Sequence, residues 1–206
     1  MSAPRDDGLR ESYDQLPYET RARRKTHPDT LATLAIVFGL TPPSVEAARV
    51  LELGCGTGEI LLAIACALPG SSCVGVDFSA PQIADAEALG ATAGIGNARF
   101  ICSDFKEIAG DQQYDYVVAH GLLSWISPDR HDDLITLCGA CLAPGGLLYL
   151  SYNALPGWHH RHIVRDYLLQ ETADITDVAA KVRTARAALA SLAETVGKLD
   201  WAYGRI

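Results

Sequence analysis

Residues 49–60 read RVLELGCGTGEI, and this stretch decides the fold. The apolar residues up to Leu53 have the short, near-continuous pattern of a strand that is buried on both faces. Gly54, Gly56 and Gly58 follow within five residues, and a helical pattern begins directly after them. Glycine lets a backbone approach a ligand closely, and the N–H groups at the beginning of a helix attract polar ligand atoms. The stretch therefore predicts a strand, a ligand-binding loop and a helix in succession.

Strand and helix patterns continue to alternate as far as residue 153. The predicted strands are residues 49–53, 72–78, 98–105, 114–120 and 146–153, and the predicted helices between them are residues 59–68, 80–90 and 128–142. This alternation predicts an α/β fold with a doubly wound, mostly parallel sheet and helices on both faces. An N-terminal helical arm precedes the sheet, and only helices are predicted after residue 153. A sixth and a seventh strand are not evident.

The composition is that of a soluble globular protein, with 49% hydrophobic and 20% charged residues among 206. The formal net charge of -8 makes nucleic acid a poor partner. No signal peptide or membrane-spanning pattern is evident, so a cytoplasmic protein is expected. Cys138 and Cys141 form a single C-x2-C pair in an apparently apolar helix, so no metal site is predicted. The oligomeric state is not indicated.

The chemistry of the glycine loop depends on its spacing and on Glu52. A dinucleotide site prefers G-x-G-x-x-G, whereas the last gap here is one residue shorter. A carboxylate beside the loop would repel a pyrophosphate but would suit a ligand that carries an ammonium or sulfonium group. An NAD-dependent oxidoreductase is therefore only a remote alternative. Glu52 could instead pair with the beginning of a neighbouring helix.

Acidic residues also follow the second and third predicted strands. Asp77 lies 19 residues after Gly58, where a carboxylate can accept hydrogen bonds from both hydroxyls of a ribose. Asp104 can accept from an adenine amino group, and Phe105 beside it can flank the ring. The alternative for both acids is a capping role at the helix that follows, which for Asp77 begins near Ser79.

Together these features resemble the class I S-adenosylmethionine-dependent methyltransferases. The resemblance covers residues 45–153 and rests on ELGCGTG at 52–58, on the acids after strands two and three, and on LAPGG at 142–146. It implies S-adenosylmethionine as methyl donor and S-adenosylhomocysteine as product. The implied cofactor-binding residues are Glu52, Gly54, Cys55, Gly56, Gly58, Asp77, Phe78, Ser103, Asp104, Phe105 and His120.

A narrower resemblance concerns the flanking segments. The stretches YDQLPY, THPDTLATLAIVFGL, HGLLSW and SYNALPGWHHR resemble a bacterial group in which a methyltransferase regulatory domain follows the catalytic domain. Members of that group are usually longer, so the chain is expected to be truncated or a short member.

The expected domains are an arm with a helix at 1–45, the cofactor-binding core at 46–155 and C-terminal helices at 156–206. The helices at 156–206 could be a linker to an absent regulatory domain. The basic run at 21–25, RARRK, belongs to the arm, which is either solvated and partly mobile or a lid over the ligand.

Candidate catalytic residues are His120, which follows the fourth strand directly, Tyr152 and Tyr18. His120 has a suitable reference pKa of about 6.5 for a base, but it could equally line the cofactor. Candidate substrate-binding residues are Trp125, Asn153, Trp158 and His159. Trp125 could instead belong to the core, and Trp158 could stabilise the beginning of a helix. No catalytic residue stands out, because methyl transfer depends chiefly on positioning.

The sequence therefore predicts a methyltransferase that acts on an unidentified acceptor, either a protein side chain or a small molecule. A domain that binds the cofactor without turnover is the alternative. Membrane association is not expected.

Overall fold

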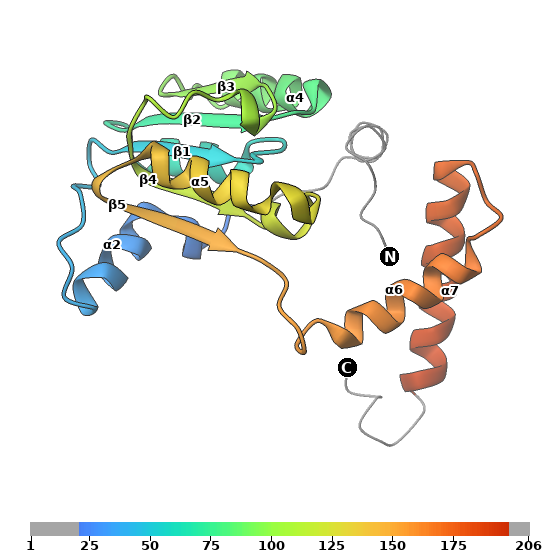
Figure 1. Cartoon of the computed structure of the whole chain (residues 1–206). Coiled ribbons are helices and arrows are strands. Elements are labelled where there is room, and N and C mark those ends of the chain that lie inside the picture. The colour runs from blue at the N-terminus through green and yellow to red at the C-terminus, as the bar shows by residue number, and fades with distance from the viewer. Residues whose placement is uncertain (1–20, 198–206) are drawn as a thin grey trace. The chain divides into compact units, whose positions relative to one another are not determined.

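The computed structural model describes residues 21–197. The described residues form two compact units, one ending at Tyr152 and the other beginning at Asn153. The first unit contains a sheet of five parallel strands in the order β3-β2-β1-β4-β5 (Figure 1). These strands are β1 (Arg49–Leu53), β2 (Ser72–Asp77), β3 (Ala98–Cys102), β4 (Tyr114–His120) and β5 (Leu142–Ser151). The predicted doubly wound fold is confirmed, and it is all-parallel within the described residues.

Helices alternate with these strands, as the sequence predicts. In the first unit they are η1 (Arg24–Thr26), α2 (Pro28–Val37), α3 (Glu59–Ala67), α4 (Ala80–Thr92), η2 (Phe105–Glu107), η3 (Leu122–Ser124), η4 (Pro128–Arg130) and α5 (His131–Cys141). The second unit contains α6 (His159–Glu171) and α7 (Val178–Gly197), which contact each other. None of the described helices is long and apolar enough to cross a membrane.

Two hydrophobic cores cover the two faces of the sheet. Leu51 and Leu53 of β1 pack in the core that contains Leu134 of α5. Val50 of β1 packs in the other core, which contains Ile64 of α3 and residues of α2. Successive side chains of a strand point to opposite faces, and β1 is apolar from Val50 to Leu53 except at Glu52.

The strand order reverses beside β1, and this reversal places the ligand site. The chain passes from β1 to β2 and β3 on one side, and then returns to β4 and β5 on the other (Figure 1). The chain thus continues from β1 and from β4 toward opposite edges of the sheet, and a crevice forms at the carboxyl ends of such strands. The predicted loop at residues 54–58 lies at this point.

Two strand boundaries differ from the prediction by more than two residues. β3 ends at Cys102, so Asp104 lies in the following loop, where it caps η2. β5 begins at Leu142, because this residue already pairs with Tyr114, and an irregularity between Tyr114 and Tyr116 accommodates the next four residues. An apolar pattern interrupted by Pro144 and two glycines did not indicate this early pairing.

The basic run at 21–25 has exposed side chains, as expected of a solvated segment, but its backbone is anchored. Thr26 is buried, and its hydroxyl donates to the carbonyl of Arg23 at 2.8 Å. The hydroxyl of Thr30 donates to the carbonyl of Arg24 at 2.9 Å. His27, rather than an acid, caps α2 through its Nδ1 atom. The backbone of this segment is therefore fixed, while its side chains stay exposed.

Candidate functional site

The glycine loop is a turn with left-handed backbone angles, which only glycine adopts easily. Gly54, Gly56 and Gly58 have φ angles of 72°, 54° and 79°, in the left-handed region that side chains disfavour. The N–H groups of Gly54 and Cys55 donate to the carbonyl of Val76 at 2.8 and 3.1 Å. The loop is thereby fixed to the end of β2, and α3 begins directly after it.

Close packing limits the loop further. A Cβ atom on Gly58 would lie 2.9 Å from both the Cβ of Ala86 and the ring of Phe100, and one on Gly54 would lie 3.1 Å from Leu122. The contact with Leu122 brings the loop after β4 against the loop after β1. Cys55 is 1% exposed, and its carbonyl accepts from the N–H of Gly58 at 3.0 Å, so this residue shapes the loop from within.

Glu52 lies beneath the loop and is 1% exposed. It shares the face of Val50, and its carboxyl accepts a hydrogen bond from the N–H of Leu61 in the first turn of α3. Burial raises the pKa of Glu52 well above its ordinary value, and the nearby carboxylates of Asp77 and Glu59 add to the rise. Its Oε2 atom is buried and has no hydrogen-bond partner in the described part of the chain. A buried acceptor beside the loop fits a ligand that carries a positive charge or an N–H donor.

Asp77 joins the loops that follow β1 and β2, and it is 8% exposed. Its Oδ2 atom accepts from the N–H of Gly56 at 2.9 Å, and its Oδ1 atom accepts from the N–H of Ser79 at 3.0 Å. The carboxylate therefore orients the loop, and it does so at the strand end where a ribose is expected.

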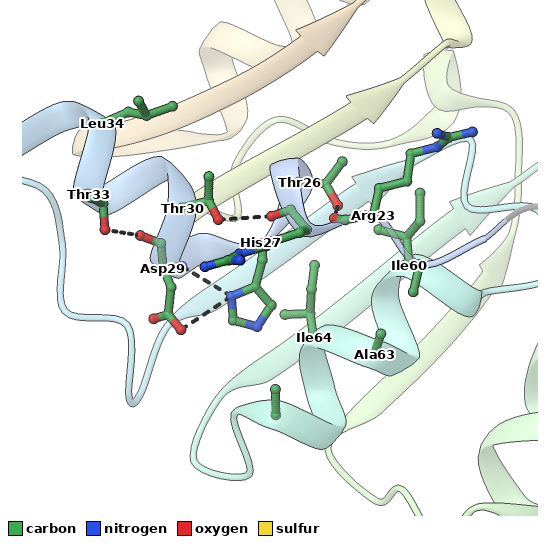
Figure 2. A pocket seen from close by; sticks show the side chains of 13 residues that line it. Arg23, Thr26, His27, Asp29, Thr30, Thr33, Leu34, Ile60, Ala63 and Ile64 are labelled. Atoms are coloured by element: carbon green, nitrogen blue, oxygen red, sulfur yellow. Dashed lines mark hydrogen bonds and ion pairs between the residues drawn. The ribbon is translucent and has the colours of Figure 1, made fainter.

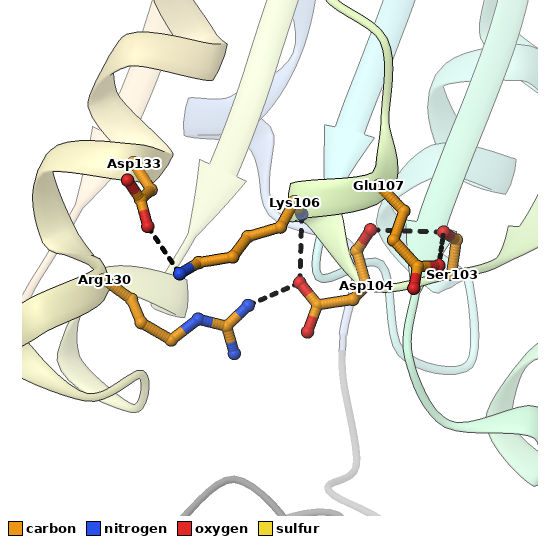
Figure 3. A network of polar contacts seen from close by, with 6 residues as sticks. All are labelled: Ser103, Asp104, Lys106, Glu107, Arg130 and Asp133. Atoms are coloured by element: carbon orange, nitrogen blue, oxygen red, sulfur yellow. Dashed lines mark hydrogen bonds and ion pairs between the residues drawn. The ribbon is translucent and has the colours of Figure 1, made fainter.

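Asp104 belongs to a polar network that also includes Arg130 (Figure 3). Its Oδ1 atom accepts from the N–H of Lys106 at 2.9 Å and pairs with the guanidinium of Arg130. Arg130 is buried, and its guanidinium carbon lies 4.4 Å from the centre of the Phe105 ring. The hydrogen bonds of the Asp104 side chain within the described residues all end on Oδ1, which leaves Oδ2 for a ligand.

Phe105, which was expected to flank the adenine, is buried in the core that contains α5. Arg130 covers one of its faces, so the ring supports the network, and its contact with an adenine stays a prediction. Ser103, which precedes the network, donates its hydroxyl to Glu107 at 3.0 Å. Its N–H donates to the carbonyl of Asp77 at 2.9 Å and joins the second and third loops.

We expect Arg130→Gln to weaken S-adenosylhomocysteine binding by about tenfold. The substitution removes a charged hydrogen bond, worth about 1.5–3 kcal/mol, that orients Asp104. Calorimetric titration measures the change. Asp133→Asn is the matched control, because it breaks only the exposed pair between Lys106 and Asp133 at 2.6 Å in the same network. Equal affinities of the wild-type and Arg130→Gln chains would show that Asp104 needs no support from Arg130.

His120 ends β4, and Ser151 lies opposite it at the end of β5. The Nδ1 atom of His120 is 2.7 Å from the hydroxyl oxygen of Ser151, which also accepts from the N–H of Gly121 at 2.8 Å. Burial lowers the pKa of His120, and the charges of Arg23 and Lys25 lower it further. The ring is therefore neutral more readily than a free histidine.

The other predicted site residues of the first unit follow the ends of β2, β4 and β5. Trp125 directly follows η3 and is 51% exposed, so it is not a core residue. Tyr152 follows β5 and is 61% exposed. Phe78 lies directly after β2, where its carbonyl accepts a contact from the Cys102 thiol at 3.8 Å. Tyr18 lies outside the described residues.

Three candidates, Asn153, Trp158 and His159, lie in the second unit. The guanidinium carbon of Arg161 lies 4.5 Å from the centre of the Trp158 ring, an arrangement that stabilises the beginning of α6. The rings of His159 and His162 meet edge to face at 6.5 Å. No cluster of ligands that could hold a metal ion occurs among the described residues.

A pocket of about 690 Å³ lies between α2 and α3 (Figure 2). Its apolar wall comes from α3, including Ile60 and Ile64, and its polar wall comes from the segment that contains Arg23 and His27. None of the residues predicted for the cofactor or the substrate lines it. Arg23 belongs both to this wall and to the surroundings of His120.

Arg130 and Ser151 were not identified from the sequence. Arg130 lies 26 residues from Asp104, and no local pattern indicates that the two meet. Ser151 could have been found, because neighbouring parallel strands end side by side and it closes the strand next to His120.

Comparison with known proteins agrees with this geometry. Residues 50–146 match a family described as a methyltransferase domain. A trans-aconitate 2-methyltransferase from Variovorax paradoxus is 40% identical over 110 residues, which are 53% of this chain and 40% of that protein. Protein RP789 of Rickettsia prowazekii is 33% identical over 197 residues, which are 94% of this chain and 35% of that protein.

A solved structure supports the same assignment. The structure of PKMT2 from Rickettsia typhi in complex with AdoHcy has a TM-score of 0.79 and 31% identity, and it matches 92% of this chain and 36% of that one. The chain thus spans only about a third of the length of RP789 and of PKMT2.

Proposed function

Because residues 50–146 belong to the class I S-adenosylmethionine-dependent methyltransferases, we propose that this chain transfers the methyl group of S-adenosylmethionine to an acceptor. The observation that carries the proposal is Asp77, whose carboxylate orients the glycine loop at the strand end where a ribose would bind. The orphaned Oε2 atom of Glu52 and the left-handed glycines fit the same ligand.

Each loop has a separate task in this proposal. Gly54, Gly56 and Gly58 admit the methionine part of the cofactor, and Glu52 beneath them attracts its ammonium group. Asp77 and Phe78 hold the ribose. Asp104, oriented by Arg130, accepts from the adenine amino group, and Ser103 fixes the loop between Asp77 and Asp104.

The methyl group of the cofactor is bonded to a sulfonium, which is an excellent leaving group. The protein then needs to align the acceptor with the methyl carbon and to exclude water. We assign this side of the site to the ends of β4 and β5, where His120 and Tyr152 lie. Trp125, Asn153, Trp158 and His159 remain proposed substrate contacts.

The acceptor is the open part of the proposal. The name of the Variovorax relative points to a small organic acid, and a protein side chain is the other class of acceptor expected from the sequence. Both classes belong in the test. Binding of the cofactor without transfer to either class would support the alternative of a binding domain.

Calorimetric titration with S-adenosylmethionine and S-adenosylhomocysteine tests the cofactor site, with NAD as the negative control. Transfer of a radiolabelled methyl group to trans-aconitate and to a protein extract tests the activity. Binding of NAD in place of S-adenosylhomocysteine would contradict the proposal.

A further inference from the structure

The pair formed by His120 and Ser151 has a defined arrangement of hydrogen bonds. The two residues face each other across neighbouring strands, with 2.7 Å between Nδ1 and the hydroxyl oxygen. The same oxygen accepts the N–H of Gly121 at 2.8 Å. The backbone N–H can only donate, so one lone pair of the Ser151 oxygen is occupied.

This arrangement decides which ring nitrogen carries the proton. Among the described residues, Nδ1 of His120 is the acceptor within reach of the Ser151 hydroxyl hydrogen. When the hydroxyl donates to Nδ1, every group in the cluster is satisfied, and the proton of a neutral ring lies on Nε2. If Nδ1 carried the proton, the serine oxygen would accept twice, and its own hydrogen would lack a partner in this cluster.

The surroundings of the ring favour its neutral form. His120 is partly buried, and Arg23 and Lys25 are the charged residues that act on it in the described part of the chain. Figure 2 shows Arg23 reaching from the anchored segment before η1. Burial lowers the pKa of His120, and the positive charges of Arg23 and Lys25 lower it further because they repel a protonated ring.

We propose that Ser151 is a positioning residue that holds His120 as a neutral ring with its proton on Nε2. The Nε2–H group of His120 then donates a hydrogen bond to the methyl acceptor, and His120 takes no proton from that acceptor. Within the described residues Nε2 has no protein partner, so it is the ring atom left for a ligand. The part that concerns the acceptor rests on the proposed methyltransferase function, whereas the tautomer does not.

The assignment constrains the chemistry of transfer. A lone pair of the acceptor forms a bond to the methyl carbon, the carbon–sulfur bond breaks, and its electron pair remains on sulfur. A carboxylate acceptor becomes a neutral ester while the sulfonium becomes a neutral thioether, so no proton moves. An ammonium acceptor would first have to lose a proton to water, because Nε2 already carries one. Acceptors without a proton to lose are therefore favoured.

¹⁵N NMR of the chain labelled with ¹⁵N-histidine tests the tautomer of His120 directly, because protonated and unprotonated ring nitrogens have different chemical shifts. The chain has six histidines, and His120→Gln identifies the signals of His120 by their loss. We expect the proton on Nε2 at pH 7 in the wild-type chain and in Ser151→Thr, which retains the hydroxyl. In Ser151→Ala we expect that preference to weaken, with a larger share of the rings protonated on Nδ1.

Ser72→Ala is the matched control, since this exposed strand serine lies at the opposite end of the sheet and should leave the His120 signals unchanged. Ser151→Cys, with a weaker donor, replaces Ser151→Ala if that chain does not fold. A proton on Nδ1, a doubly protonated ring at pH 7, or an unchanged tautomer in Ser151→Ala would overturn the inference. Titration of the same chains with S-adenosylhomocysteine tests the proposed function separately. A chain that does not bind this ligand would contradict the proposed function and would leave the assignment of the tautomer unaffected.

Discussion

The Asp77→Ala chain is expected to bind S-adenosylhomocysteine at least about 100-fold more weakly than the wild-type chain. The substitution removes the acceptor proposed for the ribose and also the hydrogen bonds that Gly56 and Ser79 donate. Hydrogen bonds to a charged group contribute about 1.5–3 kcal/mol each, and a factor of ten corresponds to about 1.4 kcal/mol. The two ribose hydroxyls would donate two such bonds to Asp77 in the proposed complex, and loss of both exceeds a factor of about 100.

Calorimetric titration at neutral pH measures this loss. Asp77→Asn serves as the partial variant, because its amide oxygen can still accept from one N–H group while the negative charge is gone. We expect its affinity to lie between those of the other two chains. If Asp77→Ala bound the ligand as tightly as the wild-type chain, the ribose would have to bind elsewhere, and the proposed site would be wrong.

The Gly58→Ala chain is expected to lose roughly 2–5 kcal/mol of its free energy of unfolding. A left-handed conformation costs an alanine about 1–2 kcal/mol, and overpacking adds about 1–3 kcal/mol. The overpacking arises because the new Cβ atom would lie 2.9 Å from Ala86 and from Phe100. Ala86 is fully buried on α4 and has little freedom to move.

Urea unfolding followed by circular dichroism measures the difference. Gly94→Ala is the matched control, because Gly94 has a similar φ of 69° but no atom within 4 Å of an added Cβ. We expect Gly94→Ala to lose about 1–2 kcal/mol only, the cost of the conformation itself. Equal losses in the two chains would show that the packing around Gly58 can yield.

The order of strands and helices could be predicted because each buried strand has a run of apolar residues and because glycine or polar residues mark the turns between elements. β1 shows this most clearly, since the glycines after Leu53 mark the point where the strand ends and α3 begins. The beginning of β5 could not be predicted, because Pro144, Gly145 and Gly146 interrupt its apolar pattern. Pairing with β4 determines that boundary, and pairing is not a local property.

The acidic residues of the candidate site could also be predicted from the apolar pattern of the strands. Glu52 and Asp77 are polar residues that interrupt or end apolar strands, and such positions stand out in a sequence. The partners that orient them did not stand out. Arg130 looks like an ordinary helix residue until the fold brings it over Phe105, and Ser151 looks like the polar end of a strand until its register with His120 is known.

The position of β5 has a consequence for the behaviour of the chain in concentrated solution. Among the described residues it has a neighbour on one side only, so its outer backbone groups are open to another extended peptide. Pro144 lacks an N–H group and, with the irregularity beside it, protects the first half of this edge. No described strand pairs with the outer side of the second half, and Leu148 there is partly exposed. Self-association through this half of β5 should therefore set the limit on solubility, and a charged residue in place of Leu148 should raise that limit.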